Sequence, residues 1–141
     1  MLTGINANET KPYISKLDPD KENPTTFQIG VLDPFLRAFI DDQATAFKVS
    51  SKNPNDDTDA NVAMNKRNIL AVKFGLKGLE NFIDPQTKKV VVFDTISTSI
   101  NKSNYPAVTD QIIRMFRKEL IDELSVVILN DNKLTGEDAK N

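Results

Sequence analysis

Hydrophobic positions along the chain repeat first at every second residue and later at every third or fourth, a pattern that predicts a strand followed by helices. Residues 25–29 alternate in character and include β-branched and aromatic types, which predicts a short strand with Phe27 and Ile29 on one face. The preceding residues, 1–23, are polar and rich in turn-forming types, so we expect an N-terminal arm there. Residues 24–141 are then expected to form one domain.

The clearest helix signal begins at Asp33 and Pro34. An Asp carboxylate accepts hydrogen bonds from the free N–H groups of a first turn, and Pro at the next position loses no hydrogen bond there. The apolar residues that follow recur at helical spacing and predict a helix over residues 34–47 with one buried stripe. The stripe comprises Phe35, Leu36, Phe39 and Ile40.

A second helix is predicted after a polar segment, residues 50–59, which has the composition of a loop. Apolar residues at helical spacing predict that this helix runs from residue 60 to residue 74 or 79. Gly75 and Gly78 lie at its end, and we expect one of them to adopt a left-handed conformation as a C-terminal cap. The apolar stripe comprises Val62, Ile69, Val72, Leu76 and Leu79, widened by Ala63, Leu70 and Phe74.

A β-hairpin is predicted over residues 82–93. Its turn is expected at residues 84–88, and the β-branched residues 90–93 are expected to form a strand covered on both faces. Residues 95–104 are rich in Ser, Thr and Asn, which predicts a ragged strand or a loop.

The last helical signal covers residues 107–130, where large aliphatic residues recur at intervals of three and four. A break near residues 117–119 would also fit this pattern. Beyond it, Thr135 and Asp138 have the spacing of a capping box for a final short turn. Together these elements predict an α+β fold, a single domain in which three helical regions pack on a small antiparallel sheet.

Composition narrows the chemistry that this fold can carry. The 141 residues include no Cys, His or Trp, which removes disulfides, Cys-ligated metal centres and histidine-based proton transfer. The 18 Lys and Arg residues and 20 Asp and Glu residues give a net charge of −2, so no overall positive field would attract nucleic acid or an anionic membrane. The N-terminal residues lack the order of a signal peptide, and no apolar run approaches the roughly 20 residues that span a bilayer. We therefore expect a cytosolic protein.

Some local patterns match ligand-binding motifs only in part. Segments that start at Asp18 and at Asn53 have the spacing that opens an EF-hand loop, but neither has the closing Glu that binds calcium. Residues 75–78 lack the third Gly, or the Lys-Ser/Thr pair, of phosphate-binding loops. No nucleophile elbow is present. The sequence therefore assigns no catalytic, cofactor-binding or metal-binding residue, and we expect a protein that is not an enzyme.

Two groups of basic residues are candidates for contact with an acidic partner, and the alternative is a solvated helix face. Three aromatic residues at the edges of predicted elements are further candidates, and the alternative is packing at the edge of the core. The basic groups comprise Lys66, Arg67, Lys73 and Lys77 on the second predicted helix and Arg114, Arg117 and Lys118 on the last. The partner-contact candidates are Tyr13, Phe47, Phe82, Arg114 and Arg117.

Three blocks of the chain carry a resemblance to a known family. They are KLDPDKENPTTFQIGVLDPFLRAFIDD (residues 16–42), NKRNILAVKFGLKGLENFID (residues 65–84) and LIDELSVVILNDNKLTGEDAKN (residues 120–141), about half of the chain. In this order they resemble small morphogenesis proteins encoded among the structural genes of tailed bacteriophages, namely tail assembly chaperones and neighbouring small virion proteins.

The resemblance implies a non-catalytic protein that binds other phage components, such as tail, tape-measure or capsid proteins, in the cytoplasm of the host bacterium. An assembly chaperone is the first hypothesis. A structural virion subunit, such as a connector, decoration or tail protein, is the second, and a homo-oligomer would suit it. A phage-encoded inhibitor or nucleotide-binding protein acting on host defence is the third; a deep polar pocket lined by Arg114, Arg117 or Lys73 would favour it. Neither a membrane nor nucleic acid is an expected partner.

Overall fold

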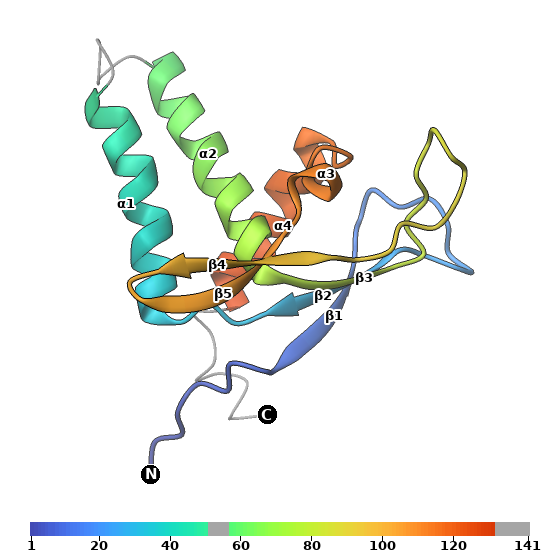
Figure 1. Ribbon diagram of the computed structural model, residues 1–141. Coiled ribbons are helices and arrows are strands. Elements are labelled where there is room, and N and C mark those ends of the chain that lie inside the picture. The colour runs from blue at the N-terminus through green and yellow to red at the C-terminus, as the bar shows by residue number, and fades with distance from the viewer. Residues whose placement is uncertain (51–56, 132–141) are drawn as a thin grey trace.

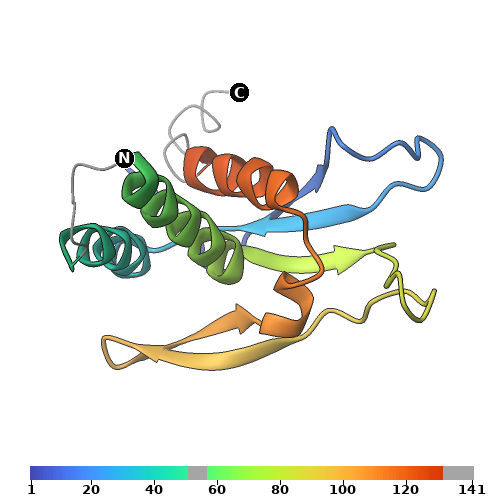
Figure 2. The same cartoon turned by 90° about the horizontal axis from the view of Figure 1, so that it is seen from above.

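The computed structural model describes residues 1–50 and 57–131. It shows helices that pack over a small antiparallel sheet, with a separate β-hairpin beside that sheet (Figures 1 and 2). The predicted α+β class and the single domain are confirmed. The one expected sheet is in fact two sheets, of three and two strands. In chain order the elements are β1 (Thr10–Ile14), β2 (Thr26–Gly30), α1 (Pro34–Ser50), α2 (Asp57–Gly75), β3 (Leu76–Glu80), β4 (Thr95–Ile100), β5 (Ser103–Val108), α3 (Asp110–Ile113) and α4 (Lys118–Asp131).

Strand β2 is the centre of the three-stranded sheet and pairs antiparallel with β1 and with β3. Phe27 and Ile29 are both buried, as their alternation predicts, and Phe27 meets the ring of Phe116 edge to face at 6.0 Å. Residues 10–14 of the expected polar N-terminal arm form strand β1 and belong to the sheet. Its sequence gives little strand signal, since an edge strand that buries few side chains needs no apolar alternation.

Helix α2 lies between α1 and α4 and runs directly into β3 (Figure 2). The expected left-handed cap at Gly75 or Gly78 is wrong, because no described glycine has a positive φ. A Cβ atom on Gly75 would lie 2.5 Å from Cγ2 of Ile128 in α4. Gly75 is therefore needed for the close approach of two helices.

The predicted start of α1 is confirmed, since the N–H of Leu36 donates to Asp33 Oδ1 at 2.8 Å. The predicted apolar stripes are only partly correct. Leu36 and Ile40 are buried, whereas Phe35 is 68% exposed. On α2, Val62 and Ile69 are exposed and small residues such as Ala71 are buried, because α2 packs against helices on two sides and close packing admits small side chains there.

The expected hairpin of residues 82–93 forms over residues 82–91, where the N–H of Val91 donates to the carbonyl of Phe82 at 2.8 Å. The N–H of Lys88 donates to the carbonyl of Asp84 at 2.8 Å, and a single bridge joins Ile83 to Val90. Residues 91–94 form no strand, and Val92 is 84% exposed, so the expectation of a strand covered on both faces is wrong. Three consecutive Val residues indicate β propensity, but propensity alone does not provide a pairing partner.

The second sheet is the β4–β5 hairpin. Its two-residue turn places Asn101 and Lys102 at φ 51° and 67°, the left-handed values that a tight hairpin needs. Strand β4 agrees with the strand alternative for residues 95–104, but residues 107 and 108 belong to β5 rather than to the last helix. The predicted break is present, at residues 114–117 between α3 and α4. Thr135 and Asp138 lie outside the described residues.

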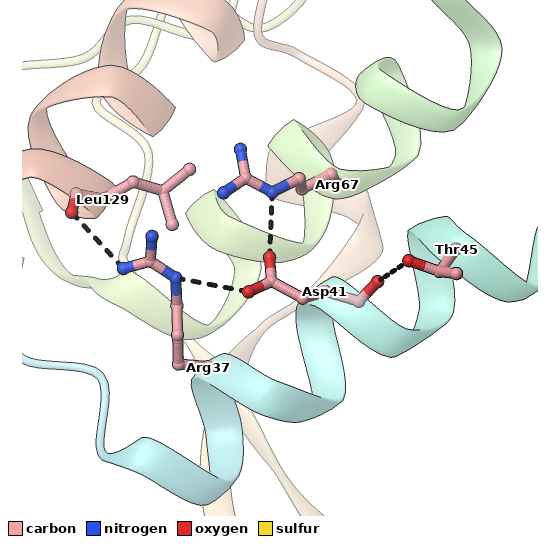
Figure 3. A network of polar contacts seen from close by, with 5 residues as sticks. All are labelled: Arg37, Asp41, Thr45, Arg67 and Leu129. Atoms are coloured by element: carbon pink, nitrogen blue, oxygen red, sulfur yellow. Dashed lines mark hydrogen bonds and ion pairs between the residues drawn. The ribbon is translucent and has the colours of Figure 1, made fainter. Parts of the chain in front are cut away.

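A polar network joins the three long helices (Figure 3). Arg67 Nε of α2 donates to Asp41 Oδ1 of α1 at 3.0 Å, and Arg37 Nε lies 3.8 Å from Asp41 Oδ2. Arg37 Nη1 also donates to the carbonyl oxygen of Leu129, in the last turn of α4, at 3.3 Å. Such half-exposed ion pairs contribute on the order of 1 kcal/mol or less each, so they orient helices that the core already holds together.

Replacement of Gly75 by Ala tests the helix contact. We expect the free energy of unfolding to fall by about 1–3 kcal/mol because the new methyl group overlaps Ile128. Urea denaturation of Gly75→Ala, Ile128→Ala and the double variant would measure the coupling energy between the two positions. Gly75→Ala should lower the free energy of unfolding by less in the Ile128→Ala background than in the wild type. Gly4→Ala is the control, since a Cβ there meets nothing within 4 Å. Equal losses in both backgrounds would contradict the contact.

Candidate functional site

Tyr13, a predicted contact residue, is part of the fold's own bonding. Its hydroxyl donates to Glu123 Oε2 in α4, while Ser15 Oγ and the N–H of Lys16 donate to the same carboxylate at 2.6 and 2.8 Å. Burial raises the pKa of Glu123, but the hydrogen bonds from Ser15, Tyr13 and Lys16 together outweigh it and hold the pKa below its ordinary value. This carboxylate therefore fastens the end of β1 to α4.

Phe82 also packs inward. Its ring is half-buried and meets Phe116 edge to face at 5.3 Å, at the border of the core. The side chain of Phe47 lies outside the described residues. Arg114 and Arg117 are both exposed, in the segment between α3 and α4. The structure thus leaves both arginines exposed and makes Tyr13 and Phe82 packing residues.

The basic group predicted on the second helix does not exist as one surface. Arg67 is paired with Asp41, and Lys73 Nζ lies 2.9 Å from Asp110 Oδ1 in α3. Lys77 is not on the helix at all, because the helix ends at Gly75 and Lys77 belongs to β3. The sequence did not reveal this boundary, because Leu76 and Leu79 of β3 continue the helical spacing of the apolar residues of α2.

Strand β4 presents an open edge. Within the described part of the chain it pairs only with β5, so one side of its backbone has no strand partner. In a hairpin with a two-residue turn, the flanking residues exchange both backbone hydrogen bonds, and the ladder then alternates. Ile100 and Ser103 flank the turn. The alternation therefore directs the N–H and C=O groups of Ser97 and Ser99 away from β5, toward the open edge.

Strands β1 and β4, each at the edge of its sheet, differ in how they resist further pairing. Charged residues and Pro on an edge are the usual protection against addition of another strand. Strand β1 carries both, at Lys11 and Pro12. Strand β4 has the sequence TISTSI, without charge or Pro, and Ile96 is 61% exposed. The Pro of the hairpin, Pro106, lies on the inner strand β5 instead.

The segment that leads into β4 is apolar and exposed. Ile83 and Val90 face each other across the single bridge, and both side chains are about half exposed, as is usual for contact surfaces rather than for a core. Val92 and Ile96 extend this exposed apolar character into β4. A cavity of about 260 Å³ lies beside the segment, between residues 84–94 and α3. Its lining includes Thr87, Val91, Thr109, Gln111 and Met115.

The acidic turn after β1 binds its own backbone. Asp18 accepts from the N–H groups of Asp20 and Thr25 at 2.9 and 2.7 Å, and these two hydrogen bonds lower the pKa of Asp18. The spacing that opens an EF-hand thus serves a loop that closes on itself. Among the described residues, no group of three or more carboxylates is placed to hold a metal ion. Over the same residues, no helix has the length and apolar character needed to cross a bilayer.

Comparison with protein-family models, curated proteins and solved structures gave no match. The open β4 edge is a site that reasoning from the sequence missed. The signal for it was present in the uncharged run of residues 95–100, next to two residues, Asn101 and Lys102, that accept a tight turn.

The Tyr13 contact predicts a specific alkaline instability. Burial, the hydrogen bond to Glu123 and the charge of that carboxylate raise the pKa of Tyr13 to about 12, whereas an unfolded chain loses this proton near pH 10. Between these values the folded state binds more protons, so its stability must fall as pH rises. Urea denaturation from pH 9 upward should show a steeper fall for the wild type than for Tyr13→Phe. Identical slopes would mean that this hydroxyl is not held as described.

Proposed function

We propose that the protein binds other proteins without catalysis, as a tail-assembly-chaperone-like factor in the formation of tailed-phage particles. The observation that carries the proposal is the open, uncharged edge of β4. An extended segment of a partner adds to such an edge through main-chain hydrogen bonds, and pockets for alternate side chains provide specificity. The exposed Val92 and Ile96 offer apolar contacts to such a segment, and the cavity beside residues 84–94 offers a pocket for one of its side chains.

The partner would be a tail, tape-measure or capsid protein encoded near this chain, and binding would take place in the host cytoplasm. The resemblance of residues 16–42, 65–84 and 120–141 to phage morphogenesis proteins supports this choice of partner. An assembly chaperone must release its client, and a short edge with few charged groups provides affinity that depends on backbone pairing and modest apolar contact. Arg114 and Arg117, exposed after α3, would add contacts to an acidic client.

A structural virion subunit is the second candidate, and the same edge supports it. Two copies related by a two-fold axis can pair their β4 strands antiparallel, which gives a closed dimer with one continuous sheet. The two roles differ in a simple way, because a subunit remains in purified particles and a chaperone does not. The third hypothesis is a nucleotide-binding inhibitor, which a polar pocket lined by Arg114, Arg117 or Lys73 would favour. None of these three residues lines the cavity beside α3 or a second, larger cavity that is lined in part by Asn104, Tyr105 and Pro106 of β5.

Replacement of Ser97 by Pro tests the edge. Pro removes an N–H that is directed away from β5, so the hairpin ladder keeps its hydrogen bonds while an added strand loses one and meets the ring. The variant would be co-expressed with the neighbouring tail, tape-measure and capsid proteins, and the isolated complexes would be measured by light scattering. We expect binding to fall by about tenfold or more. One lost main-chain hydrogen bond is worth about 1 kcal/mol, and the clash with the Pro ring adds to that loss.

A second variant, Val92→Asp, tests the exposed apolar segment before β4. Its matched control is Val126→Asp, at an exposed site on α4. Both residues are exposed Val, but only Val92 precedes β4. Val92→Asp should weaken the complex and Val126→Asp should not. Undiminished binding by Ser97→Pro and Val92→Asp, with both proteins folded, would contradict the proposed surface.

A further inference from the structure

Lys77 occupies a bulge in the three-stranded sheet. Gln28 of β2 pairs with Gly78 of β3. The next residue, Ile29, pairs with Leu76, so Lys77 is an extra residue without a partner across the ladder. A bulge re-aims the side chain of the extra residue and is common beside functional sites.

The aliphatic part of the Lys77 side chain lies across Gly30. A Cβ atom on Gly30 would come within 2.4 Å of Lys77 Cγ and 2.8 Å of Lys77 Cε. Any larger residue at position 30 would therefore displace the Lys side chain. The bulge directs the Lys77 side chain toward the end of β2, and the absence of a side chain at Gly30 leaves room for it there.

Lys77 lines a cavity of about 400 Å³ under β5, a volume within the range of small-molecule sites. Its walls come from the N-terminal residues, the β2–α1 connection and β5. The apolar part of the lining is Ile5, Ala7, Val31, Leu36 and Pro106, and the polar part is Asn8, Thr10, Asp33, Lys77, Asn104 and Tyr105.

Among the described residues, the cavity lining has one cation, Lys77, and one carboxylate, Asp33, and only the carboxylate has hydrogen-bond partners. Both oxygens of Asp33 are engaged, one by the N–H of Leu36 and the other by the hydroxyl of Tyr105 at 2.7 Å. The Lys77 ammonium group forms no hydrogen bond or ion pair with any described residue, and burial lowers the pKa of Lys77. A half-buried ammonium group without a counter-ion is costly, and an anion in the cavity would remove that cost.

We infer that this cavity binds a small organic carboxylate, with its anionic group at Lys77 and its apolar body against Ile5, Leu36 and Pro106. One positive charge matches one carboxylate. A doubly charged phosphate would lack a second cation, and Asp33 would repel it more strongly than it repels a single carboxylate. Asn8, Thr10 and Asn104 offer further polar groups around the anion. The site is separate from the β4 edge, so it stands or falls independently of the proposed partner binding.

Hexanoate is a suitable probe, and hexanamide is its uncharged counterpart. In NMR titrations of the full chain, hexanoate should shift the amides of Asn8, Lys77, Asn104 and Tyr105, whereas hexanamide and inorganic phosphate should shift them at least tenfold more weakly at equal concentration. Lys77→Met keeps the aliphatic packing over Gly30 and removes the charge, so it should weaken hexanoate binding at least tenfold. Lys21→Met, on the exposed turn before β2, is the matched control and should bind normally.

The inference is wrong if about 10 mM hexanoate shifts none of these amides, since a ligand with a dissociation constant near 1 mM would saturate the site. It is equally wrong if Lys77→Met binds hexanoate as the wild type does, or if phosphate binds as strongly. Should Lys77→Met fail to fold, Lys77→Gln takes its place, and the phosphate and hexanamide titrations of the wild type test the inference without any variant.

Discussion

The contact between Gly75 and Ile128 is the constraint on which the rest of the structure depends. It lets the end of α2 lie directly on α4, at a distance where a single methyl group would overlap. Because α2 continues into β3 without a loop, this contact also fixes where β3 begins and how it meets β2. The position of Lys77 in the bulge and the packing of β5 beside β3 follow from the same junction.

Carboxylates join elements that the core alone would leave adjustable. Asp33 caps α1 and also accepts the Tyr105 hydroxyl of β5. Glu123 of α4 gathers three donors from the end of β1, and Asp41 of α1 contacts arginines that reach α2 and α4. A buried carboxylate that accepts several hydrogen bonds is satisfied without a metal or a ligand. In this chain the conspicuous acids therefore serve the fold, which agrees with a surface whose contacts are made by backbone and apolar groups.

Local signals in the sequence predicted the elements that depend on local physics. The Asp33 cap, the strand at Phe27 and Ile29, and the turn after Asp84 all follow from interactions within a few residues. The failures were non-local. Gly75 was expected to be a cap, but it serves a helix contact with Ile128, 53 positions away along the chain. Residues 91–93 have strand propensity, but beyond the Ile83–Val90 bridge no strand in the described part of the chain pairs with them.

The candidate sites were harder to predict than the fold, for the same reason. Tyr13 and Phe82 looked like exposed aromatics because nothing nearby in sequence revealed Glu123 and Phe116. An open strand edge is a property of the whole sheet: β4 has one because, among the described residues, only β5 pairs with it.

The most direct test of the open edge is hydrogen exchange of individual amides in the isolated protein. The account predicts that the amides of Ser97 and Ser99 exchange rapidly, while those of Ile96, Thr98 and Ile100, which point toward β5, are protected. Equal protection of all five amides in a dilute, monomeric sample would show that the edge is already covered, and would contradict the account.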